Sequence, residues 1–316
     1  MAALTDSDLP NLKLLSKGKV RDVYATSSPD HLLFVASDRI SAYDVILKNG
    51  VPNKGKILTS LSLFWFQKLF PNPISSIKTH FVTANIDEMP SEVRQYKDQL
   101  EGRSMLVRKA KVVPLEAIVR GYITGSGWAE YKKKGTVHGI KLPEGLVESQ
   151  KLPEPLFTPS TKAEQGQHDE NISPARAAEI IGKELYDQIS TVAVEIYKAA
   201  ADYALTRGLI LADTKFEFGL VPSSDPSTPE KQDLILIDEL LTPDSSRYWP
   251  LKGYEPGKGQ DSFDKQYLRN WLTKNGFKKG LESGPKGKEG QGWVMTEEVV
   301  KGTAQRYEEA LRLLTQ

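Results

Sequence analysis

Two apolar segments that end in acidic residues constrain the fold of this 316-residue chain more than any other feature. The first is LILADTKFEFGL at 209–220, and the second is LILIDELLTPDSSRYWP at 234–250. In an extended strand alternate side chains share a face, so Asp213, Lys215 and Glu217 point to one side and the residues between them to the other. Three ionisable groups beside such apolar neighbours are costly to bury unless they pair or meet a metal or a charged ligand. The first segment therefore predicts a strand that carries a site.

The second segment places Asp238 and Glu239 at the exit of a short apolar strand, LILI. Carboxylates in that position often hold the magnesium ion of a nucleotide phosphate. Taken alone, the first strand fits equally well a solvated face with cross-strand ion pairs. A polar, proline-rich loop at 222–232 joins the two strands, and the combination favours a hairpin that carries catalytic groups.

Composition narrows the class of protein. At 35.2 kDa the chain is long for one core, so we expect two subdomains with a ligand cleft between them. Lys+Arg number 42 and Asp+Glu 41, so the chain lacks the basic excess that nucleic-acid binding requires. Cysteine is absent and His numbers four, which excludes thiol chemistry and favours a hard cation on carboxylates. Residues 1–13 have neither the basic start nor the apolar core of a signal peptide, and no apolar run approaches membrane-spanning length, so a cytoplasmic protein without a membrane partner is expected.

The N-terminal part reads as an antiparallel sheet with one helix. Short strands are expected over 12–48, and the last of them, at 38–47, is expected to be exposed. Gly18 lies in a turn that carries Lys17, Lys19 and Arg21. Cations on a glycine turn suit a phosphate, although a solvated hairpin tip has the same residues. The residues 55–70 have apolar side chains at helical spacing, and two more strands are expected at 104–113 and 114–123, broken by Pro114.

Candidate anion-binding residues follow this sheet. The run Gly125-Ser126-Gly127 opens an amphipathic segment, where backbone N–H groups and a hydroxyl bind anions, while N-capping by Ser126 is the simpler explanation. Arg120, on an apolar strand, needs a negative partner and favours the ligand interpretation. The long loop at 150–172 adds three candidates: Lys162, His168 and Asp169.

Helices dominate the rest of the chain. Ser173-Pro174 is typical of a helix start, and a longer helix with a regular apolar seam should end at Gly208. Two further helices are expected over 262–276 and from about Thr296 to the C-terminus, with a mobile surface segment at 284–292.

Seven motifs, in this order, resemble those of the SAICAR synthetase family: GKVRDVY, DRISAYDV, NKGKILTSLSLFWF, EAIVRGYITGSGWAEY, TPSTKAEQGQHDENIS, GLILADTKFEFGL and LIDELLTPDSSRYWP. The similarity runs from about residue 12 to residue 271. It implies an α+β fold, with an antiparallel, kinase-like nucleotide-binding subdomain at 1–123, a larger α+β substrate- and metal-binding subdomain at 124–316, and the ATP cleft between them.

The resemblance also implies a reaction of de novo purine synthesis. ATP, L-aspartate and 5-amino-1-(5-phosphoribosyl)imidazole-4-carboxylate (CAIR) would give SAICAR, ADP and phosphate through an acyl phosphate, with Mg²⁺ as the cofactor. Cations and a metal suit that chemistry, because positioning and charge neutralisation dominate phosphoryl transfer.

Carried over by motif, the resemblance implies a role for each candidate residue. The ATP-binding residues would be Lys17, Gly18, Lys19, Val20, Arg21, Arg108, Ala110 and Glu217. The CAIR- and aspartate-binding residues would be Arg120, Ser126, Lys162, His168, Asp169 and Arg247. Lys215 and Asp213 would be catalytic, and Asp238 would hold magnesium.

Two other functions use the same residues. A small-molecule kinase would stop at a phosphorylated product and would not depend on aspartate. A catalytically silent nucleotide-binding or scaffold protein would not turn over ATP, and the intact set Lys19, Lys215, Asp238 and Arg247 argues against it. The sequence leaves the oligomeric state and the number of Mg²⁺ ions open.

Overall fold

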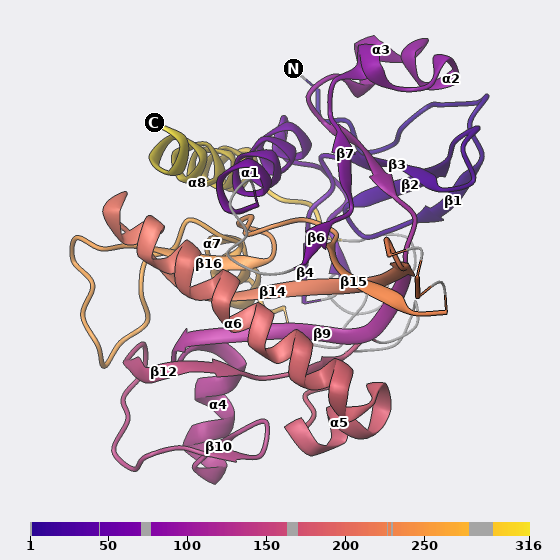
Figure 1. The fold of residues 1–316 in the computed structure, drawn as a ribbon. Coiled ribbons are helices and arrows are strands. Elements are labelled where there is room, and N and C mark those ends of the chain that lie inside the picture. The colour runs from indigo at the N-terminus through magenta and orange to yellow at the C-terminus, as the bar shows by residue number, and fades with distance from the viewer. Residues whose placement is uncertain are drawn as a thin grey trace.

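Two β-sheets organise the fold of this computed structural model, which describes residues 2–43, 45–70, 77–162, 170–225, 227–228, 230–277 and 293–316 (Figure 1). In chain order the elements are β1 (Leu14–Lys17), β2 (Arg21–Ala25), β3 (His31–Ala36), β4 (Ser41–Ala42), β5 (Val45–Ile46), α1 (Lys54–Leu69), β6 (Lys78–Thr79), β7 (Phe81–Thr83), the 3₁₀ helix η1 (Ile86–Glu88), α2 (Ser91–Arg94), α3 (Lys97–Leu100), β8 (Ser104–Arg108), β9 (Lys111–Tyr122), α4 (Gly125–Lys134), β10 (Thr136–Val137), β11 (Ile140–Lys141), β12 (Lys151–Phe157), β13 (Ser160–Thr161), α5 (Pro174–Ile181), α6 (Lys183–Thr206), β14 (Leu209–Pro222), β15 (Gln232–Ile237), β16 (Ser246–Pro250), α7 (Gln266–Lys274) and α8 (Glu297–Thr315).

The first sheet is antiparallel and has the order β1-β2-β3-β8-β7. The second has the order β12-β9-β14-β15-β6, with β13 also beside β9 and β16 beside β14. Its strands pair antiparallel except for the short parallel pair β15 and β6. The expected α+β class with antiparallel sheets is confirmed. The expected hairpin is also present, because β14 and β15 pair directly.

The chain passes from the first sheet to the second between Arg108 and Lys111, so the expected strand break at Pro114 is wrong. Pro114 lies inside β9, where the register with β14 shifts between the pairs that Val112 and Glu116 make. A bulge of this kind tolerates a residue without an N–H group. The division of the chain at residue 123 stays a prediction.

The segment at 38–47, expected to be exposed, is largely buried, so that expectation is also wrong. Asp38 is 1% exposed and Arg39 6%. Asp38 accepts hydrogen bonds from the Gly55 N–H at 2.9 Å and from Arg103 at 3.0 Å, while Arg39 donates to Asp22 at 2.6 Å. Charged residues can be buried when their charges are paired. The partners of Asp38 and Arg39 are distant in sequence, so local sequence did not reveal them.

The expected helices are present, but the expectation of one helix in the N-terminal part is wrong, because η1, α2 and α3 follow α1 there. Ser173 and Thr296 accept hydrogen bonds from the Arg176 and Val299 N–H groups and so cap α5 and α8. The long helix α6 ends before Gly208, whose φ of 72° suits glycine. The segment at 284–292, expected to be mobile, lies outside the described residues. No helix within the described ranges combines the length and apolar character that a membrane crossing needs.

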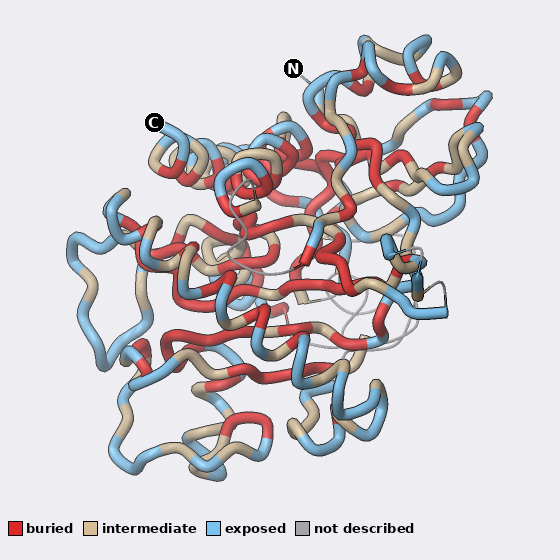
Figure 2. Tube along the Cα trace, in the orientation of Figure 1, coloured by how far each residue is buried: buried red, intermediate tan, exposed pale blue. Residues whose placement is uncertain are grey.

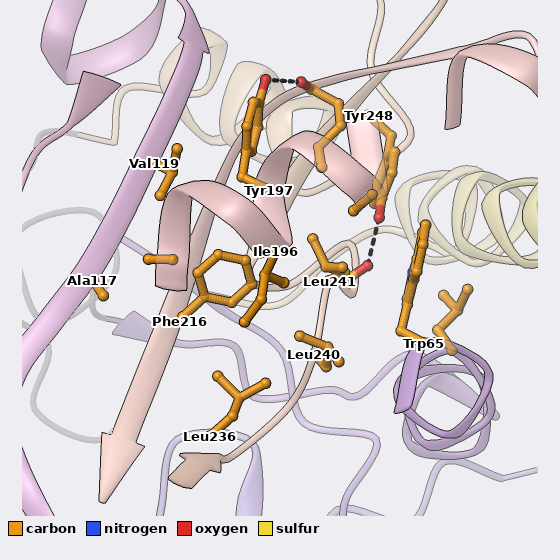
Figure 3. Close-up of a cluster of buried hydrophobic side chains, with 14 of the residues drawn as sticks. Trp65, Ala117, Val119, Ile196, Tyr197, Phe216, Leu236, Leu240, Leu241 and Tyr248 are labelled. Carbon is orange, nitrogen blue, oxygen red and sulfur yellow. Dashed lines mark hydrogen bonds between the residues drawn. The ribbon is translucent and has the colours of Figure 1, made fainter. Parts of the chain in front are cut away.

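Helix α6 packs across one face of the second sheet (Figure 1), and the strands beneath it are largely buried (Figure 2). Figure 3 shows Phe216 of β14 against Ile196 of α6 and beside Ala117 and Val119 of β9. Burial of each large apolar side chain stabilises the fold by roughly 1.5–3 kcal/mol. The apolar alternate residues of β14 thus form core, which leaves its polar face for the opposite side of the sheet.

Candidate active site

Strand register assembles the polar face of β14 with its neighbours. Across β9, Asp213 pairs with Arg120 and Glu217 pairs with Glu116; across β16, Asp213 pairs with Arg247. Directly opposed residues of antiparallel strands project from the same face. Three strands therefore bring their charged residues together on the side away from α6.

A cavity of about 680 Å³ lies over this face. Sequence-predicted residues from both sheets line it: Gly18, Lys19, Val20, Arg21, Arg120, Ser126, Lys162, Asp213, Lys215, Glu217, Asp238 and Arg247. The glycine turn of the first sheet therefore faces the acidic hairpin of the second.

Other predicted residues lie elsewhere. Lys17 is not among the residues that line the cavity, and its side chain is 52% exposed and pairs with Asp6. Arg108 and Ala110 are also outside the lining, and Ala110 packs against the cluster that contains Ile237. Their expected contacts with ATP stay predictions. His168 and Asp169 lie outside the described residues.

Asp213 accepts hydrogen bonds from two arginines on one oxygen atom. Arg120 donates to its Oδ2 at 3.1 Å, and Arg247 donates to the same atom. Arg120 is only 4% exposed and also donates to Thr158 Oγ1 at 3.1 Å and Ser126 Oγ at 3.3 Å. Two guanidinium groups share one carboxylate, so this cluster keeps a net positive charge beside the cavity. A phosphate or carboxylate ligand would complete it.

Ser126 is not the N-cap of α4, because Thr124 occupies that position. The hydroxyl of Ser126 instead lies at the cavity lining, in contact with Arg120. This placement leaves the anion-binding interpretation of Ser126 as the better explanation of the two that the sequence allowed.

A second charged cluster surrounds Glu217. Lys215 Nζ lies 2.9 Å from both Glu116 and Glu217, and Lys162 also pairs with Glu217. Burial raises the pKa of Glu217, but Lys215 and Lys162 outweigh burial and bring that pKa to about 2. Burial lowers the pKa of Lys215, but its two glutamate partners outweigh burial and leave the pKa raised. Lys215 is therefore a permanent cation that can neutralise an anion and cannot act as a general base.

The acidic residues after β15 face the glycine turn. Arg21 pairs with Asp238, and its other nitrogen lies 3.8 Å from Glu239. The backbone carbonyl of Asp238 lies 3.1 Å from His80 Nε2, and Asp238 itself has a φ of 67°. These contacts fix where its carboxylate points.

The described residues contain no cluster of three or more His, Cys, Asp or Glu arranged to hold a metal. Magnesium rarely needs one, because it binds through one or two carboxylates together with water and substrate phosphate oxygens. Asp238 and Glu239 supply two carboxylates beside a turn suited to phosphate, so these residues fit a nucleotide-bound Mg²⁺ and do not fit a preformed all-protein site.

Several lining residues were not predicted from the sequence: Glu116, Asp244, Asp264, Lys265 and Arg269. Asp244 is buried and accepts hydrogen bonds from Lys54 at 2.7 Å and from Tyr307 at 2.7 Å, and Lys265 Nζ lies 3.2 Å from it. Strand alternation from Arg120 could have identified Glu116. Lys265 and Arg269 are one helical turn apart and look like an ordinary solvated face until the tertiary structure is known.

Comparisons with known proteins identify relatives over the whole chain. The family model described as SAICAR synthetase matches residues 14–283. The chain is 55% identical over 319 residues to the phosphoribosylaminoimidazole-succinocarboxamide synthase of Cyberlindnera jadinii, covering 99% of this chain and 98% of that protein. It is 52% identical over 316 residues to the protein of the same name from Maridesulfovibrio salexigens, covering 99% and 97%.

Solved structures agree with this relationship. A SAICAR synthase from Saccharomyces cerevisiae, in complex with SAICAR, superposes with a TM-score of 0.83 at 48% identity, covering 99% of this chain and 98% of that one. A SAICAR synthetase from Pyrococcus horikoshii OT3 has a TM-score of 0.61 at 24% identity, covering 93% and 97%. The second likeness is evidence for the fold alone.

Proposed function

Because the chain belongs to the SAICAR synthetase family, we propose that the cavity on the polar face of β14 is the site at which L-aspartate is joined to CAIR. The chain is an ATP-dependent ligase of purine biosynthesis, as its full-length relatives are. The observation that supports the site best is the cavity itself, which combines a glycine turn, paired carboxylates and two arginines that share one aspartate. The kinase alternative is not favoured, because relatives covering nearly the whole chain carry the synthase name.

ATP would lie between the two sheets. The turn at 18–21 would cover its phosphates, and Glu217 would lie near the ribose. Asp238 and Glu239 would hold Mg²⁺, which supplies charge neutralisation at the phosphates when bound. Arg21 pairs with these two acids in this structure, and its guanidinium group would contact the phosphates once Mg²⁺ occupies the acids.

CAIR would bind at the opposite end of the cavity. Arg120 and Arg247 share Asp213, which leaves a net positive charge for the CAIR phosphate, and Ser126 adds a hydroxyl. Lys215 stays protonated and would lie near the reacting carboxylate, with Lys162 beside it. His168 and Asp169 would belong to the same substrate site.

The reaction would proceed through an acyl phosphate. A carboxylate oxygen of CAIR attacks the γ-phosphorus of ATP, and ADP leaves. The amine of aspartate then attacks the acyl carbon, phosphate leaves with that oxygen, and the amide of SAICAR forms. Fixed cations assist both steps because negative charge develops on the transferring phosphoryl group and on the leaving phosphate.

An isotope experiment tests this proposal. We expect ADP release by the full chain to require Mg²⁺, CAIR and L-aspartate together. CAIR labelled with ¹⁸O in its carboxylate should yield labelled phosphate in the same amount as SAICAR. Unlabelled phosphate would eliminate the acyl phosphate, because its oxygen would then come from water. Phosphorylated CAIR formed without any dependence on aspartate would instead support the kinase.

A cytoplasmic location, expected from the sequence, is part of the same proposal. Fractionation of the source cells, with the protein followed by antibody, tests it.

A further inference from the structure

Arg39 lies directly behind the glycine turn, although the sequence gives it no role. Its side chain donates five hydrogen bonds: to the Gly18 carbonyl at 3.0 Å, the Lys19 carbonyl at 3.3 Å, the Thr5 carbonyl, and the two carboxylate oxygens of Asp22 at 2.6 and 3.4 Å. A guanidinium group has five N–H donors in a planar fork. One side chain therefore reaches three backbone carbonyls and one acid at once.

The other carbonyl groups of the turn are also engaged from within the protein. The Val20 carbonyl accepts from the Ser37 N–H at 3.0 Å and from its hydroxyl at 2.8 Å, and the Arg21 carbonyl accepts from the Gly18 N–H at 2.8 Å. A Cβ atom on Gly18 would lie 2.8 Å from that Arg21 carbonyl oxygen, so the turn needs glycine there. Each carbonyl from 18 to 21 thus has a partner inside the protein.

The direction of these carbonyl groups matters for an anion. A peptide oxygen is the negative end of its dipole, so an oxygen that faces the cavity would repel a phosphate, whereas N–H groups attract one. Glycine permits rotation of the adjacent peptide groups more readily than other residues. Holding the Gly18 and Lys19 carbonyls in place therefore requires a donor behind them.

Arg39 is suited to that task by its burial and by its pairing. It is 6% exposed, does not line the cavity, and is neutralised by Asp22, which is 2% exposed. A paired charge so placed cannot contact a nucleotide, and its effect on one must pass through the turn. Lysine has a single nitrogen and no fork, so it could not reach both carbonyls and the acid in the same geometry.

We propose that Arg39 is a positioning residue for nucleotide binding, which holds the peptide oxygens of Gly18 and Lys19 away from the phosphates of a Mg²⁺-bound nucleoside polyphosphate. This inference rests on the proposed function, in which the turn covers the phosphates of ATP. It adds that the affinity of the turn for the nucleotide phosphates depends on a buried arginine from the β3–β4 connection.

Calorimetric titration of the full chain with ADP and Mg²⁺ tests the inference without turnover. Arg39→Met should weaken ADP binding about tenfold or more, and Arg39→Lys should recover part of that loss. Steady-state kinetics should show a raised KM for ATP in both variants, with the KM for CAIR nearly unchanged. A purely structural role would not separate these two constants.

Arg103→Met is the matched control. Arg103 is 5% exposed and pairs with buried Asp38 at 3.0 Å, in the same part of the fold, but it makes no hydrogen bond to the turn. Its ADP affinity should stay within about twofold of the wild type. An equal loss in the Arg103 and Arg39 variants would overturn the inference, because the cause would then be general destabilisation.

A milder variant keeps the test decisive if Arg39→Met does not fold. Ser37→Ala removes one of the two hydrogen bonds to the Val20 carbonyl and should weaken ADP binding about two- to threefold. Wild-type affinity in folded Ser37→Ala and Arg39→Lys would overturn the inference. Failure of the wild type to bind ADP at all would overturn the proposed function instead.

Discussion

Single carboxylates in the cleft each serve two cations. Asp213 is shared by two arginines, Glu217 by two lysines, and Asp244 by two further lysines. Around Asp213 and around Asp244 the two cations exceed the central acid by one charge. The two lysines around Glu217 are balanced, because Lys215 also pairs with Glu116. At the scale of the residue, the surplus around Asp213 supports the proposal that a phosphate or carboxylate substrate binds there.

Arg247→Ala tests the surplus of positive charge at the end of the cleft where we propose that CAIR binds. A charge-assisted hydrogen bond contributes on the order of 1.5–3 kcal/mol, so the KM for CAIR should rise about tenfold or more. Asp213 keeps Arg120 as its partner, and the KM for ATP should stay near the wild-type value. Steady-state kinetics with each substrate varied in turn measure both constants. If the two rise equally, Arg247 does not bind CAIR.

The C-terminal helix shows how an element far from the cleft in sequence supports it. Tyr307 of α8 donates to Asp244 at 2.7 Å, and Asp244 also accepts from Lys54 at the start of α1. Tyr203 of α6 makes a second contact with α8, donating to the Leu314 carbonyl at 2.9 Å. Helices α8 and α1 are thereby tied to a residue that lines the cavity, and α6 is tied to α8.

The two tyrosines make a matched pair for a stability experiment. Tyr307→Phe removes a hydrogen bond to a buried carboxylate and should lower the free energy of unfolding by about 1.5–3 kcal/mol. Tyr203→Phe removes a bond between neutral groups and should lower it by about 0.5–1.5 kcal/mol. Urea unfolding at pH 7 compares them. Equal losses would contradict the view that Asp244 is the charged centre of this helix junction.

For the whole molecule, the cleft joins the two sheets, and its ion pairs link the stability of the fold to pH. Burial raises the pKa of Glu217, but Lys215 and Lys162 outweigh burial and bring it from 4.5 to about 2. The unfolded chain therefore binds more protons at this group between those two values. The contribution of Glu217 is complete above about pH 4.5 and is lost as the pH falls toward 2.

Comparison of the wild type with Glu217→Gln isolates this contribution. The wild type should be more stable than the variant at pH 7, by on the order of 3 kcal/mol. The difference should shrink steadily as the pH is lowered below about 4.5, because the wild-type side chain becomes neutral too. Urea unfolding at several pH values measures it. A difference that does not change with pH would show that Glu217 is not held ionised by its lysines.

Local patterns determined much of this protein from sequence alone. Alternation over 209–220 was enough to predict which side chains of β14 share the face that lines the cavity, because the strand period of two is a property of the backbone. The helix starts at Ser173 and Thr296 could also be predicted from local sequence, because a capping side chain accepts a hydrogen bond from an N–H group only two or three residues away. The α+β class followed from the order of such elements.

Only the tertiary structure decided which charges meet. Arg21 and Asp238 are 217 residues apart, and the sequence around either residue does not predict that it pairs with the other. The same holds for the buried pairs of Asp38 and Arg39, which looked like surface residues because their partners come from other elements. Pairing is fixed by strand register and by helix packing, and these depend on the whole chain burying its apolar residues at once.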